Sequence, residues 1–169
     1  MLSLDFFGKL ALDTLYSWSR LFLALILSML FSWTIGIAAA RNSKAEKVIL
    51  PSLDILQSIP ILGFFPLVLI IFVDIFPISI GVYLAVVFLI FTSMTWNIAF
   101  AVYEAVKSIP RELDYLATME KMSFRRRLTA LYIPSTWSKV AYNSIVSWSV
   151  ALFYLVASEI FLSGVQAIR

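Results

Sequence analysis

The chain has 169 residues, of which 62% are hydrophobic and 14% are charged, and its formal net charge is +3. Soluble domains are about half apolar and a quarter charged, so this composition places the chain among membrane proteins. It contains no histidine and no cysteine, which excludes the usual general base, the commonest metal ligands and any disulfide framework.

Four long stretches without a charged residue follow one another along the chain. They cover residues 21–40, 55–73, 75–103 and 140–158. A helix needs roughly 20 residues to cross the hydrocarbon core of a bilayer. With their flanks, the stretches predict spans at about 18–40, 55–73, 77–103 and 138–162. We therefore predict an all-α, polytopic membrane helix bundle that forms one domain over residues 1–169.

Residues 1–20 precede the first span and carry apolar side chains at loose helical spacing. One interpretation is an interfacial helix that lies on the membrane surface and leads into the first span. The other is a continuation of that span beyond the membrane surface. The sequence leaves both open.

Prolines crowd the second predicted span, at Pro51, Pro60 and Pro66. A proline inside a helix removes a backbone donor and clashes with the preceding turn. In lipid, each carbonyl freed in this way needs another partner. The pattern is compatible with a simple kinked span, or with a helix broken around residues 58–66 and buried against protein.

Hydroxyl and amide side chains lie within the third and fourth spans. Most hydroxyls in membrane helices bond to their own backbone or to a neighbouring helix. Asparagine is costlier to bury unpaired, so we expect Asn97 and Asn143 to face the interior. Together with Ser93 and Ser147 they are the candidates for a polar translocation path. Glu159, at the end of the fourth span, is expected to be solvated.

The polar segment at about 107–137 separates the third and fourth spans. Its pattern predicts two short amphipathic helices rather than a loose linker. The first begins at Pro110, with acidic residues in the first turn, where the helix dipole favours them. The second covers residues 124–132, with Ser123 as its N-cap, and Pro134 is expected to end it and to open the fourth span.

Basic residues concentrate in two polar segments that the predicted spans place on one side of the membrane. Ten of the 13 lie there: Arg41, Lys44, Lys47, Lys107, Arg111, Lys121, Arg125, Arg126, Arg127 and Lys139. The positive-inside bias assigns this side to the cytoplasm. The three consecutive arginines either anchor the segment to anionic lipid heads or contact a partner protein.

No catalytic residues, metal site or cofactor are predicted. The five glycines do not form a phosphate-binding loop, and nothing in the pattern indicates a nucleic-acid partner. Four spans are also few for a self-sufficient pore, so we expect the chain to work as a subunit of a larger assembly.

The order of these features resembles the permeases of ABC importers. YLATMEKMS at 115–123, followed by YIP at 132–134, is similar to their EAA loop, and SIPREL at 108–113 is similar to the segment that leads into it. Residues 53–66 and VASE at 156–159 resemble the nitrate/sulfonate/taurine branch of these permeases. The likeness covers residues 36–159.

The sequence departs from the family pattern at three places. Tyr115 replaces a glutamate, and Lys121 replaces the glycine that normally permits the turn between the two short helices. We therefore expect another residue to take up that turn, or the bend to differ. The chain also ends soon after Glu159, where the family has one more span, which suggests a truncated, split or divergent permease.

The resemblance implies a MetI-like permease core in a prokaryotic plasma membrane. Its partners would be an ABC ATPase subunit, which hydrolyses ATP, a second permease copy in a homodimer or heterodimer, and an extracytoplasmic solute-binding protein. The substrate would be a small oxyanion or organic acid such as nitrate, sulfonate or taurine. The residues that dock the ATPase would be Leu116, Ala117, Met119, Met122 and Ser123. The alternative is a non-transporting membrane scaffold whose basic loop recruits a cytosolic protein or anionic lipid.

Overall fold

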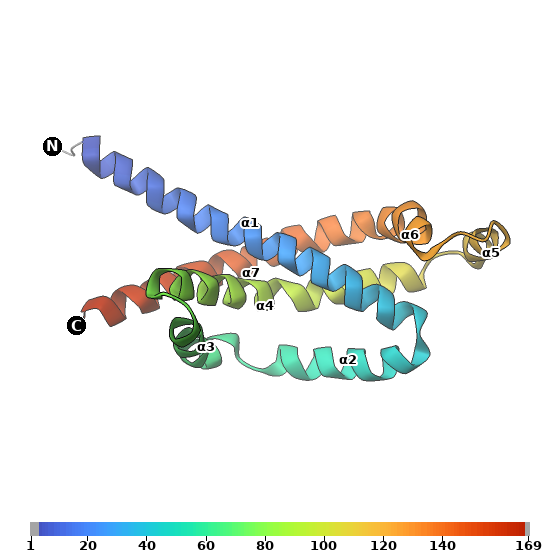
Figure 1. The fold of residues 1–169 in the computed structure, drawn as a ribbon, viewed down its shortest axis with the longest axis horizontal. Coiled ribbons are helices and arrows are strands. Elements are labelled where there is room, and N and C mark those ends of the chain that lie inside the picture. The colour runs from blue at the N-terminus through green and yellow to red at the C-terminus, as the bar shows by residue number, and fades with distance from the viewer. Residues whose placement is uncertain (1–3, 168–169) are drawn as a thin grey trace. The chain divides into compact units, whose positions relative to one another are not determined.

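The computed structural model describes residues 4–167, and every regular element within that range is a helix (Figure 1). The predicted all-α fold class is therefore confirmed. The elements are α1 (Leu4–Arg41), α2 (Ser43–Ser58), α3 (Ile61–Ile75), α4 (Ile78–Lys107), α5 (Arg111–Met119), α6 (Phe124–Arg127), a π-helical turn η1 (Leu128–Tyr132) and α7 (Ile133–Ala167).

Three helical runs in the described part of the chain are long and apolar enough to cross a membrane. They are Phe6–Arg41, Ile78–Lys107 and Phe124–Ser163, and the last contains α6, η1 and most of α7. The bent pair α2 and α3 adds a fourth when it counts as one span. Because α1 is a single helix from Leu4 onward, the N-terminal segment continues the first span, and residues 1–3 lie outside the described range.

The second predicted span is broken at Pro60. Helix α2 ends at Ser58, and Ile59 and Pro60 both have extended backbones, with ψ angles of 125° and 110°. The residue before a proline is pushed out of the α region, which accounts for the end of α2. Pro51 and Pro66 lie inside α2 and α3 without ending them. The helix is broken, as one of the two sequence interpretations has it, but Ser58, Ile59 and Pro60 are exposed, so the described residues do not bury the break against protein.

The chain divides into two compact units. Unit 1 contains α1 up to Leu27, then Pro60–Ser93, and α7 from Ser149 onward; unit 2 contains Ser28–Ile59 and Met94–Trp148. In unit 1, Phe65 is buried and packs edge-on against the ring of Phe161, with the centroids 5.4 Å apart. Unit 2 contains the polar loop and most of the residues that the sequence singled out.

Small residues at every fourth position bring α1 close to α4 in unit 2. Ser28, Ser32 and Gly36 are buried, and the Ser32 hydroxyl donates to the carbonyl of Thr95 at 3.1 Å. A Cβ atom added to Gly36 would lie 2.7 Å from Cγ1 of Val102. Small residues at this spacing let two membrane helices approach closely. The spacing of these small residues is present in the sequence, but it was not used to predict this contact.

Pro134 does not end the second loop helix, contrary to the sequence prediction. Helix α6 continues through η1 into α7, where Pro134 is the second residue. In a regular α-helix, its ring would clash with the carbonyl four residues earlier. In η1 the N–H of Ile133 instead donates to the carbonyl of Leu128, five residues back. This wider turn lets the helix continue past the proline, so α6 is continuous with the helix of the last span.

Candidate functional site

The polar loop between α4 and α7 is an ordered structure built on α5. At the C-terminus of α5, the N–H of Met122 donates to the carbonyl of Ala117 and the N–H of Lys121 to that of Thr118, both at 3.0 Å. This pair of bonds defines a Schellman motif. Lys121 has a φ of 49°, a left-handed conformation that glycine adopts most easily. The expectation that another residue would take up this turn is wrong, because Lys121 makes the turn itself.

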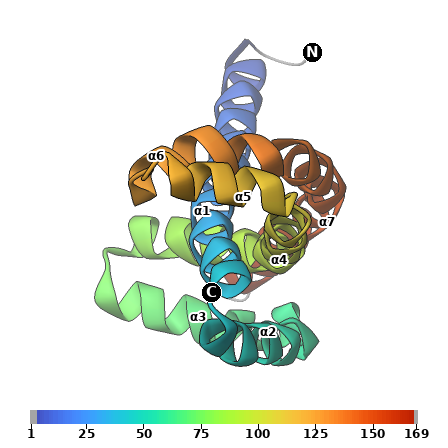
Figure 2. The same ribbon diagram turned by 90° about the vertical axis from the view of Figure 1, so that its right-hand side faces the viewer.

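Two arginines join α5 to the membrane helices of unit 2. Arg41, the last residue of α1, places Nη1 2.7 Å from Oδ2 of Asp114 in α5. Arg127 of α6 donates from Nη2 to the Ala117 carbonyl at 3.2 Å and to the Thr118 hydroxyl at 3.1 Å. Figure 2 shows α5 and α6 next to each other. Helix α5 is therefore held by the end of α1 and by the helix that continues into α7.

A third polar contact lies at the start of the loop. Lys107, at the end of α4, places Nζ 2.8 Å from Oε2 of Glu46 in α2, and the Tyr103 hydroxyl donates to Oε1 of the same carboxylate. In α2 itself, the side chain of Asn42 caps the helix by accepting the N–H of Lys44 at 2.9 Å. Glu46 of α2 is thus held by two residues of α4 in unit 2.

The five predicted docking residues have different surroundings. Leu116 and Met119 are 55% and 79% exposed and form an apolar surface on α5. Met122 is half-buried, and Ser123 caps α6 with its Oγ 3.4 Å from a backbone N–H. Ala117 is only 3% exposed. Its side chain therefore fills the interior of the loop, and the prediction that it contacts a partner directly needs correction.

Three of the four predicted path residues lie together in unit 2. Asn97 of α4 donates from Nδ2 to the Ser147 hydroxyl at 2.9 Å and to the Asn143 carbonyl at 3.3 Å, both on α7. Ser93 belongs to unit 1 and donates to the carbonyl of Ile90 in its own helix. Asn97 is exposed and Asn143 is half-buried, so the expectation of an interior position is wrong for Asn97. An exposed amide inside an apolar span is costly against lipid. This surface is better suited to water or to protein.

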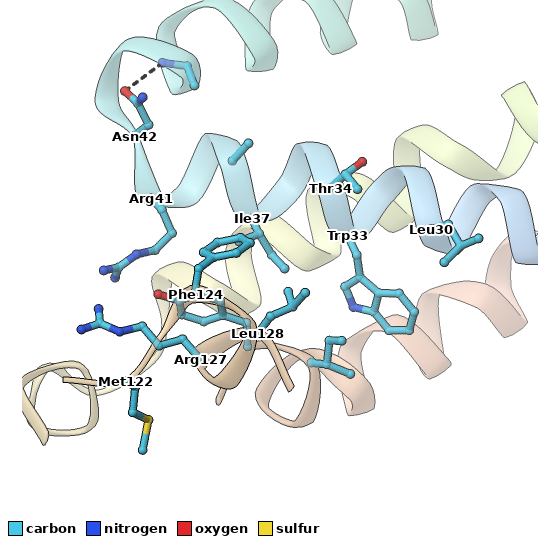
Figure 3. A pocket seen from close by; sticks show the side chains of 14 residues that line it. Leu30, Trp33, Thr34, Ile37, Arg41, Asn42, Met122, Phe124, Arg127 and Leu128 are labelled. Carbon is cyan, nitrogen blue, oxygen red and sulfur yellow. Dashed lines mark hydrogen bonds between the residues drawn. The ribbon is translucent and has the colours of Figure 1, made fainter. Parts of the chain in front are cut away.

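A groove of about 780 Å³, mostly apolar, lies in unit 2 between α1 and the helices that follow α5 (Figure 3). Arg41 and Arg127 extend toward one end of it, and Leu30 lies at the other. Trp33 lines the groove and donates from Nε1 to the hydroxyl of Thr136 at 3.0 Å. The groove was not predicted from the sequence, because its walls come from segments about 90 residues apart.

A second charged cluster lies in unit 1. The Glu159 carboxylate accepts the hydroxyl of Ser17 at 2.5 Å and lies 3.4 Å from Nη1 of Arg20. The guanidinium of Arg20 in turn lies over the ring of Tyr83, 5.4 Å from its centroid. Glu159 is 41% exposed at its side chain, so it is partly solvated, as expected, but it is also paired with a cation.

Comparison with known protein families identifies the group to which this arrangement belongs. The model of the binding-protein-dependent transport system inner membrane component matches residues 32–168, which is most of the chain. The chain belongs to this inner membrane component family. The resemblance to ABC importer permeases is thereby confirmed, and with it the assignment of the apolar helices to a membrane.

Two curated relatives of this family member are similar over most of its length. Both are the bicarbonate transport system permease protein CmpB, one from Synechococcus elongatus and one from a second Synechococcus strain. Each is 23% identical over 156 residues, which cover 92% of this chain and 54% of the relative. The chain therefore spans about half the length of the curated relatives it matches.

Proposed function

We propose that the chain is a permease subunit of an ABC importer in a prokaryotic plasma membrane. In this role it forms a solute path with a second permease copy, identical or different, and receives solute from an extracytoplasmic binding protein. The polar loop faces the cytoplasm, as the positive-inside bias indicates. The exposed surface of Leu116 and Met119 docks into a groove on an ATPase subunit, which hydrolyses the ATP.

The observation that carries this proposal is the attachment of α5. A docking helix transmits movement only if it moves with the membrane helices, because packed interfaces shift between discrete arrangements. Here Asp114 joins α5 to the end of α1, and Arg127 joins it to the helix that continues into α7. Closure of the ATPase subunits would then turn the loop and these helices together and open the path to the outside.

The Asn97 cluster supports a path for a small solute with oxygen acceptors. The Asn97 amide and the Ser147 hydroxyl carry no fixed charge, so a solute can bind there and leave. We propose a small oxyanion or organic acid such as nitrate, a sulfonate or taurine as substrate. Bicarbonate, the solute in the name of the two CmpB relatives, belongs to the same class. Uptake of these four solutes by the reconstituted complex would rank them.

The docking role is tested by Leu116→Asp. The tagged full chain is purified in mild detergent from its own host, and the P-loop ATPase that accompanies it is measured by ATP hydrolysis and by its mass. A carboxylate on the apolar surface of α5 should reduce the bound ATPase at least about tenfold, because it would be buried unpaired in the interface. Leu116 is a better test position than Ala117, since it is already exposed.

The matched control is Ala130→Asp, which adds the same charge at an exposed position of η1. It should retain the ATPase, and both variants should elute as intact chains from a sizing column. If Leu116→Asp binds as much ATPase as the unaltered chain, the docking surface is elsewhere. If the unaltered chain brings no ATPase with it, the scaffold alternative is favoured over the permease.

A further inference from the structure

The groove between α1 and the helices that follow α5 combines an apolar wall with a cationic end. Leu30, Thr34 and Ala38 recur every fourth residue on α1 and line one side, and all three are exposed. Residues of α6, η1 and the start of α7 form the other side, among them Phe124 and Leu128. Nothing in the described part of unit 2 covers these side chains, so the groove is open to whatever surrounds the helices.

The two cations at the end of the groove differ in how they are neutralised. Arg41 is paired with the carboxylate of Asp114 at 2.7 Å. Arg127 donates to a carbonyl and a hydroxyl, both neutral, and takes part in no ion pair among the described residues. A guanidinium has five N–H donors and stays charged, so Arg127 keeps its charge and spare donors at the end of an apolar groove (Figure 3).

The position of the groove along α1 decides what can fill it. Leu30 to Ala38 lie within the uncharged stretch 21–40 of a helix that is long and apolar enough to cross a membrane. From Leu30 to Arg41 the helix rises about 16 Å, which is roughly half of a 30 Å hydrocarbon core. An apolar channel of one leaflet's depth that ends at an unneutralised guanidinium matches an amphiphile with an acyl chain and an anionic head.

We propose that this groove is a binding site for an anionic phospholipid. One acyl chain lies along Leu30, Thr34 and Ala38, and the phosphate accepts hydrogen bonds from Arg127, next to Arg41. This assigns different roles to the three consecutive arginines. Arg125 and Arg126 are exposed and do not line the groove, so they meet lipid heads only as diffuse surface charge, whereas Arg127 holds one lipid in a fixed place.

The test uses the absence of cysteine from the chain. Thr34→Cys places a single thiol in the groove, and Ile145→Cys places one at an exposed position of α7 outside it. Each full-length variant is labelled with a small fluorophore and reconstituted in mixed vesicles. Either the phosphatidylglycerol or the phosphatidylcholine carries bromine on its acyl chains, and the bromine quenches a nearby fluorophore.

Brominated phosphatidylglycerol should quench the label at position 34 with an apparent affinity on the order of fivefold higher than that of brominated phosphatidylcholine. A preference of this size corresponds to about one arginine contact with an anionic lipid. The label at 145 should be quenched equally by both. Adding Arg127→Gln should abolish the preference at 34, and the matched change Arg126→Gln should leave it intact. Ala38→Phe, which fills the groove without altering charge, should reduce quenching by both lipids at 34 alone.

Three results would overturn the proposal. Equal quenching by both lipids at position 34 would show that the groove holds bulk lipid without selection. Absence of quenching at 34, with normal quenching at 145, would show that protein, such as a second copy of the chain, covers the groove. A preference that survives Arg127→Gln but disappears in Arg126→Gln would assign the effect to surface charge. Each variant should elute as a folded, monodisperse species, which keeps these outcomes interpretable.

Discussion

At the residue scale, the backbone of Lys121 shows how this loop departs from others of its family. A side chain in the left-handed region costs about 1–2 kcal/mol, and Lys121 occupies that region with a φ of 49°. The Schellman bonds at 3.0 Å around it require this geometry. The loop thus keeps the turn that glycine normally provides and carries a small strain at one residue.

Lys121→Gly is therefore expected to stabilise the loop by about 1 kcal/mol, since glycine enters the left-handed region freely. Resistance of the loop to limited proteolysis and the melting temperature in detergent should both rise. Lys121→Ala, which removes the same charge but keeps a Cβ atom, should give no such gain. Equal effects of the two substitutions would mean that charge, rather than backbone strain, governs this position.

At the element scale, the order of helices followed from simple sequence patterns, whereas the way they pack did not. Uncharged runs of about 20 residues marked the spans because charged groups are excluded from lipid, and Pro60 marked the break because of its effect on Ile59. The π-helical turn that carries α6 past Pro134 left no comparable signal. The turn arises from backbone geometry over several residues, whereas a proline by itself predicts the end of a helix.

The close approach of α1 and α4 is the packing feature most open to test. Gly36→Ala would place a Cβ atom 2.7 Å from Cγ1 of Val102 and 3.0 Å from the carbonyl of Ala99. We expect a loss of about 1–3 kcal/mol in the free energy of unfolding, the usual effect of overpacking, read as a lower melting temperature in detergent.

The control lies in the same helix. Gly8 has no atom within 4 Å of a Cβ added to it, so Gly8→Ala should leave stability unchanged or raise it slightly through helix propensity. Adding Val102→Ala to Gly36→Ala should recover part of the loss. If Gly36→Ala were as harmless as Gly8→Ala, the contact between α1 and α4 would have to be looser than these distances indicate.

At the scale of the whole molecule, fold class and family were within reach of the sequence, but the fine structure of the site was not. Composition and the order of loop features indicated a membrane permease, which the family match over residues 32–168 confirms. Asn97 was chosen for the cost of burying an amide, and it does contact α7 through the Ser147 hydroxyl and the Asn143 carbonyl, but it is exposed rather than interior. The Arg41–Asp114 pair and the groove escaped notice, because they depend on which segments of the chain lie together.

The same ion pair gives a test of how the loop works within a complete importer. Its partners are 40% and 33% exposed at their side chains, so solvent screens it and it contributes at most about 1 kcal/mol to stability. The ion pair therefore matters mainly because it joins α5 to α1. Asp114→Arg should leave ATPase binding and melting temperature nearly unchanged, because Leu116 and Met119, the proposed docking residues, remain in place.

Solute-stimulated ATP hydrolysis by the complete complex, in contrast, should fall at least about fivefold in Asp114→Arg, the lower range of coupling between distant sites. The exchange Arg41→Asp with Asp114→Arg restores the attraction and should recover part of the stimulation. Recovery is incomplete because the guanidinium of Arg41 also lies over the ring of Tyr132, 5.5 Å from its centroid. If Asp114→Arg alone kept full solute stimulation of ATP hydrolysis, Arg127 alone would transmit movement from α5 to the membrane helices.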